Sequence, residues 1–117
     1  MKNQSFAKRL SYALAGIRTA FQSESSFRIQ CASATAAILF LAITRPQPVW
    51  WALVFISIAV VLAAELINTA LEFIVDRLHP DQHPLIGKAK DCSAAAVLIL
   101  SLSSLGVAAA LILEYFK

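Results

Sequence analysis

The residues best suited to chemistry are three acids and an asparagine at helical spacing: Glu65, Asn68, Glu72 and Asp76. At about 100° of rotation per residue, their side chains fall within an arc of roughly 80° on one face of a helix. The residues between them are mostly apolar, so the segment predicts a membrane helix with one acidic face. Such a face is costly to desolvate, and we expect it to meet cations, water or a polar partner.

A second charged cluster follows a polar connection, where another apolar stretch begins. It contains Lys90 and Asp91. If the two helices pack antiparallel, these side chains lie level with Asp76 at one membrane surface. Glu24 and Arg28, at the start of an earlier apolar stretch, are expected in the same layer.

This predicted layer offers the hard oxygen ligands that Mg²⁺ prefers, on Glu24, Glu72, Asp76 and Asp91. Lys88 and Lys90 supply cations for phosphate groups. Glu65 is expected about 10 Å deeper, two helical turns away, where a carboxylate can reach a hydroxyl at headgroup depth. The arrangement fits phosphoryl transfer to a lipid hydroxyl, with Glu65 taking the proton.

Two other functions would use the same acids. They could form a helix-packing network without catalysis, or a relay in a small proton- or cation-coupled transporter. The three glycines are too scattered for a phosphate loop, so a nucleotide site must be built from side chains. His79 and His83 lack a third ligand for zinc. The sequence has no long basic tract, and this argues against nucleic-acid binding.

The elements that position these residues are predicted to be membrane helices. Hydrophobic residues make up 59% of the 117 residues and charged residues 15%, against about 25% charged in soluble domains. We expect a single all-α membrane domain over 1–117, with spans at about 25–44, 49–77 and 86–115. Apolar residues at helical spacing over about 5–22 predict an amphipathic surface helix.

The distribution of basic residues predicts the orientation in the membrane. Basic side chains gather in the N-terminal segment and in the connection after the second span, whereas the first connection has only Arg45 and the C-terminus only Lys117. The positive-inside rule places the N-terminus in the cytoplasm. We therefore expect a multi-pass protein of the cell inner membrane.

These motifs together resemble a known family, the small prokaryotic integral-membrane lipid kinases that comprise diacylglycerol kinase and undecaprenol kinase. The resemblance covers about residues 8 to 113. The residues that carry it are Tyr12-Ala-Leu-Ala-Gly16-Ile, Glu24, Phe27-Arg28, Glu65-Leu-Ile-Asn68-Thr-Ala-Leu-Glu72, Val75-Asp76, His83-Pro-Leu and Ala89-Lys90-Asp91.

The resemblance implies a lipid kinase that uses ATP and Mg²⁺. It implies that Glu65 is the proton acceptor and that Glu24 and Glu72 bind Mg²⁺ with the ATP phosphates. Arg28 and Glu65 are expected to contact the lipid substrate. The residues expected to line the nucleotide site are Tyr12, Glu24, Asn68, Glu72, Asp76, Gln82, His83, Lys90 and Asp91. The family is trimeric, so a homotrimer with shared active sites is expected.

The sequence departs from the family pattern in places that bear on the substrate. Residues 27–30 are closer to the undecaprenol kinases, whereas Asp76-Arg77 leans towards the diacylglycerol kinases. An arginine of the latter branch aligns with Ser5, and Lys8 or Arg9 would have to replace it. We expect phosphorylation of 1,2-diacylglycerol to phosphatidic acid, with undecaprenol as the alternative substrate.

Overall fold

The computed structural model describes residues 3–117, which form four α-helices and no strands. The helices are α1 (Phe6–Ser23), α2 (Ser25–Thr44), α3 (Pro48–Leu78) and α4 (Pro84–Tyr115). The last three are each long and apolar enough to cross a membrane. The predicted all-α membrane fold is therefore confirmed.

Local signals in the sequence explain where the helices begin. The Ser5 side chain accepts a hydrogen bond from the backbone of Lys8, and this caps α1. Pro48 and Pro84 stand in the first turns of α3 and α4, where the missing N–H of proline costs nothing. Between α2 and α3, Arg45 adopts a left-handed conformation with φ of 49°, so the chain reverses within a few residues.

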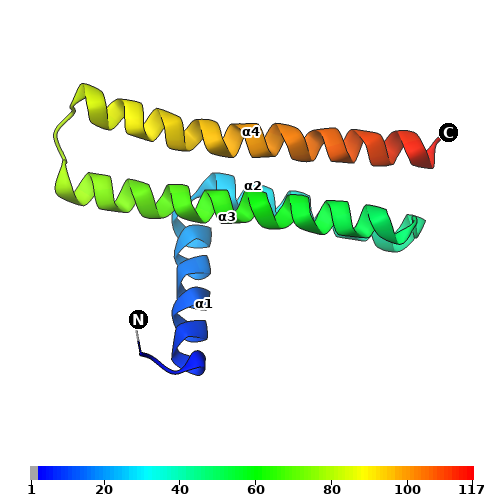
Figure 1. Cartoon of the computed structure of the whole chain (residues 1–117), viewed down its shortest axis with the longest axis horizontal. Coiled ribbons are helices and arrows are strands. Elements are labelled where there is room, and N and C mark those ends of the chain that lie inside the picture. Colours follow the sequence, from blue (N-terminus) through cyan, green and yellow to red (C-terminus); the bar gives the residue numbers. More distant parts are fainter. Residues whose placement is uncertain (1–2) are drawn as a thin grey trace.

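The helices α2, α3 and α4 lie side by side, and α3 and α4 run antiparallel along most of their length (Figure 1). On α4, the less exposed residues recur at spacings of three and four, as in coiled coils. A buried cluster near the α2–α3 turn joins the three helices through Leu41, Val54 and Leu111. Most other large apolar side chains point outward, as expected where lipid is the solvent.

The three spanning helices differ in length, and this difference positions the acidic face. The 20 residues of α2 measure about 30 Å, close to the thickness of a bilayer core, whereas the 31 residues of α3 and 32 of α4 exceed about 45 Å. Since α2 and α3 are joined by a short turn at one end of the bundle, the extra length of α3 and α4 lies at the opposite end. There the α3–α4 hairpin extends past the junction of α1 and α2 (Figure 1).

The first helix leaves the bundle and runs crosswise to it, away from α4 (Figure 1). Its apolar residues Phe6, Leu10 and Leu14 are exposed, and Ala20 near its end is buried. The Arg28 guanidinium donates hydrogen bonds to the carbonyl oxygens of Phe21 (2.7 Å) and of the next residue. Arg28 thereby caps the last turn of α1 and fixes its direction relative to α2.

Candidate active site

The most buried charged residue in the described chain is Glu65, whose exposure is 2%. Its Oε2 accepts a hydrogen bond of 3.0 Å from the Ser26 hydroxyl, which reaches across from the first turn of α2. Its backbone carbonyl accepts a second bond from the Thr69 hydroxyl. A carboxylate held this deep in a membrane helix is costly, and such residues usually serve a function.

Ser26 was not singled out by the sequence, although it is the one side chain that binds the Glu65 carboxylate in residues 3–117. The sequence carries only a weak signal for this role of Ser26, because a serine at the start of a membrane helix is common. Its partner on α3 depends on the relative depth of the two helices. That depth follows from the α2–α3 turn and from the packing around it, which the pattern of residue types does not encode.

The carboxyl group of Glu24, at the α1–α2 junction, lies beside that of Glu72 on α3. Burial raises the pKa of Glu24, and the neighbouring Glu72 raises it further by charge repulsion and a side-chain hydrogen bond. Glu65 adds a smaller repulsion, while Arg28 acts in the opposite direction. Glu24 is therefore the point where the polar ends of α1 and α2 meet the acidic face of α3.

This placement corrects the predicted layer. Glu24 was expected level with Asp76, and Glu65 two turns deeper. The structure places Glu24 beside Glu72, as expected, but within the influence of Glu65 and two residues from the Ser26 that binds Glu65. The physical reason is the greater length of α3, which carries Asp76 beyond the start of α2.

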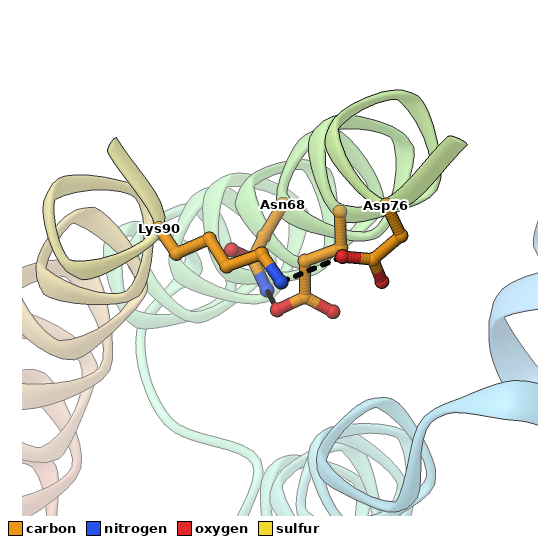
Figure 2. Close-up of polar contacts among 4 residues, drawn as sticks. Asn68, Asp76 and Lys90 are labelled. Carbon is orange, nitrogen blue, oxygen red and sulfur yellow. Dashed lines mark hydrogen bonds and ion pairs between the residues drawn. The ribbon is translucent and has the colours of Figure 1, made fainter. Parts of the chain in front are cut away.

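The extended part of the hairpin holds an ion pair. Figure 2 shows Lys90 reaching from α4 to Asp76 on α3, and the distance from Nζ to Oδ1 is 2.6 Å. This contact matches the predicted antiparallel register. Deeper along α3, the Asn68 amide nitrogen donates to Glu72 Oε1 at 3.3 Å. The amide oxygen of Asn68 is buried and has no hydrogen-bond partner in residues 3–117.

The remaining predicted site residues are not drawn into this cluster. Asp91 and Tyr12 are exposed. Gln82 lies in the α3–α4 connection, beside His83, whose Nδ1 accepts the Leu85 N–H and so caps α4. Arg28 serves as the cap of α1 described above. The contacts expected of these side chains with nucleotide or lipid stay predictions.

Carboxylate oxygens such as those of this cluster are ligands that Mg²⁺ prefers. Residues 3–117 contain no group of three or more acidic, histidine or cysteine side chains close enough to hold an ion alone. Glu24 and Glu72 nevertheless supply two adjacent carboxylates, and the Asn68 amide nitrogen holds Glu72 Oε1 in place. Mg²⁺ usually takes one or two carboxylates together with phosphate oxygens and water, so these residues fit a metal that arrives with a nucleotide.

Comparisons with known proteins agree with the resemblance seen in the sequence. A family described as "Prokaryotic diacylglycerol kinase" matches residues 11–112. The diacylglycerol kinase of Haemophilus influenzae is 38% identical over 91 residues, 75% of each chain. That of Escherichia coli K12 is 33% identical over 92 residues, 79% of this chain and 75% of the relative. The undecaprenol kinase of Bacillus subtilis is 31% identical over 99 residues, 85% and 80% of the two chains.

Proposed function

The chain belongs to the prokaryotic diacylglycerol kinase family and is a lipid kinase of the membrane, and from this premise we propose that it transfers the terminal phosphoryl group of ATP to 1,2-diacylglycerol. The product is phosphatidic acid. Most of the compared relatives that cover this chain are named diacylglycerol kinases. Undecaprenol is the second candidate, because a relative with that activity in its name matches over 85% of the chain.

The observation that best supports the proposal is the buried Glu65 carboxylate at the inner end of a polar cluster. Ser26 occupies Oε2, and no hydrogen bond to Oε1 is found within residues 3–117, so Oε1 is free to accept a proton. A lipid hydroxyl beside it would lose its proton as it attacks phosphorus. The apolar surroundings favour a substrate whose remaining parts stay in the membrane.

The nucleotide would bind on the side of Glu65 nearer to the α3–α4 connection. Glu24 and Glu72 would hold Mg²⁺, which neutralises phosphate charge when it is bound with ATP, and Asn68 would line the nucleotide site beside Glu72. Lys90, oriented by Asp76 at 2.6 Å, brings a cation to the phosphates. Tyr12, Gln82, His83 and Asp91 would complete the nucleotide contacts.

We also propose a homotrimer with sites shared between neighbouring chains. Within one chain the structure already gathers Glu24, Glu65 and Glu72. A neighbour would therefore add groups around the nucleotide or the lipid rather than these acids. The mass of the detergent-solubilised protein measures the oligomeric state directly.

The activity is tested by transfer of labelled phosphate from ATP to lipids in mixed micelles. Diacylglycerol should be phosphorylated in a Mg²⁺-dependent reaction, and undecaprenol more slowly. Transfer to undecaprenol alone would move the assignment to the second candidate. Absence of transfer to either lipid by folded protein would refute the proposed function.

The proposed orientation in the inner membrane places the N-terminus and the α3–α4 connection in the cytoplasm. In a Cys31→Ala, Cys92→Ala background, a cysteine at Gln47 should react with an impermeant thiol reagent added to intact spheroplasts. A cysteine at Gln82 should react only after the membrane is permeabilised. Equal reactivity of both positions from outside would contradict the proposed topology.

Replacing Ser26 by alanine should lower kcat by roughly 10- to 150-fold, because a hydrogen bond to a charged group is worth about 1.5–3 kcal/mol. Ser26 orients the carboxylate and does not meet ATP, so the KM for ATP should stay unchanged. Ser26→Thr keeps the hydroxyl and should retain most activity. Ser25→Ala, next to it on α2, is the matched control. Equal rates for the two alanine variants would show that Ser26 does not position Glu65.

A further inference from the structure

A groove lined mostly by apolar residues runs between α2 and α4, with α3 as its floor. Its volume is about 500 Å³. It begins one helical turn from the proposed base, since Val61 and Leu62 line it and Glu65 follows them on α3. From there it continues towards the α2–α3 turn, where Leu111 lines it. A lipid whose hydroxyl meets Glu65 would have its hydrocarbon beside this groove.

The end of the groove near Glu65 is polar. Gln30 and Ser33 of α2 and Ser101 of α4 all line it. The Gln30 amide nitrogen donates to Ser101 Oγ at 3.2 Å. One N–H of this amide remains, and no hydrogen bond donated by the Ser33 or Ser101 hydroxyl is found in the described residues.

These free donors differ from other hydroxyls on the three spanning helices. Thr35, Ser57 and Ser104 each donate to a carbonyl of their own helix four residues earlier. A hydroxyl bonded in that way needs no partner. Gln30 and Ser101 are half-buried and Ser33 is exposed, so their remaining donors are open to a ligand that brings an acceptor into the groove.

We propose that these donors bind the ester carbonyl oxygens of diacylglycerol, and that one acyl chain lies in the groove. The inference rests on the proposed lipid kinase function and deepens it. In diacylglycerol the ester carbonyls are a few bonds from the free hydroxyl. Gln30 is one turn, about 6 Å, beyond Ser26 along α2, so the hydroxyl can meet Glu65 while a carbonyl meets Gln30.

The same donors select against a polyprenol. Beyond its hydroxyl a polyprenol has only hydrocarbon, and it would leave Gln30, Ser33 and Ser101 without an acceptor. A site built to form hydrogen bonds rejects a ligand that lacks the partner group. The groove therefore distinguishes between the two substrates that the family relationship leaves open.

The test compares three lipids in mixed micelles with the full-length protein: dioleoylglycerol, its dialkyl ether analogue with the same chains and no carbonyls, and undecaprenol. The kcat/KM for the ester should exceed that for the ether about tenfold. Gln30→Leu should lower the ester value about tenfold and leave the ether value unchanged, so the ratio falls to about one. Ser101→Ala should also lower the ratio of the ester kcat/KM to the ether kcat/KM.

Thr35→Val, on α2 outside the groove, is the control and should keep the wild-type ratio. Turnover of the ether lipid reports folding of every variant independently of the proposed contact. A wild-type ratio near one, or equal losses for both lipids in Gln30→Leu, would overturn the inference and suit a groove filled by a second copy of the chain. Failure to phosphorylate any of the three lipids would instead count against the proposed function.

Discussion

Replacing Glu65 by glutamine should lower kcat by roughly 10²–10⁴, the usual contribution of a general base. Glutamine has nearly the same shape, and its amide oxygen can still accept the Ser26 hydroxyl bond. The variant therefore removes the proton acceptor and keeps the packing of a side chain that is only 2% exposed. The KM for ATP should change little, because the nucleotide meets other residues.

Glu114→Gln provides the matched control for this experiment. Glu114 is at the opposite end of α4, where it pairs with Lys117 at 2.9 Å, so its loss should leave turnover unchanged. Both variants are purified in detergent and compared by helical content before the labelled-phosphate assay. Near-normal turnover by folded Glu65→Gln protein would refute Glu65 as the base.

The sequence predicted the elements of the fold well, because their signals are local. Each spanning helix is marked by a stretch with few charges, and Pro48 and Pro84 mark the starts of two of them. The acidic face of α3 follows directly from helical spacing. The contact between Lys90 and Asp76 follows from one further assumption, that consecutive helices pack antiparallel.

The relative depth of the helices could not be predicted in the same way. Glu24 begins an apolar stretch much as Lys90 does, and the simplest interpretation put both at one level. The structure shows α3 and α4 extending past α2, so that Glu24 lies beside Glu72, as predicted, and Asp76 lies beyond it. This offset depends on how α2 packs against α3 near Leu41 and Val54, which is a property of the folded chain.

Two polar residues have structural contacts that residue type alone did not indicate. Arg28 was expected at the lipid substrate, and its guanidinium donates to carbonyl oxygens at the end of α1. His83 was expected at the nucleotide, and its Nδ1 caps α4. Each contact uses only part of the side chain's hydrogen-bonding capacity, so both predicted ligand contacts remain open to test.

Replacing Glu72 by glutamine should raise the Mg²⁺ concentration needed for half-maximal activity about tenfold and reduce the maximal rate strongly, since charge on hard oxygen ligands sets affinity for this ion. The same substitution should not destabilise the protein. Glu24 and Glu72 repel each other, and this repulsion helps to raise the pKa of Glu24, so removing one charge relieves strain in the protein without the metal. A structural role for Glu72 would instead lower thermal stability.

The measurement is a Mg²⁺ titration of activity at saturating ATP, together with thermal unfolding in detergent without Mg²⁺. Glu24→Gln should shift the titration in the same direction, because the two carboxylates are expected to share the ion. Glu114→Gln should shift neither the titration nor the unfolding temperature. An unchanged Mg²⁺ requirement in Glu72→Gln would remove Glu72 from the metal site. Loss of thermal stability with an unchanged requirement would identify it as a packing residue of α3.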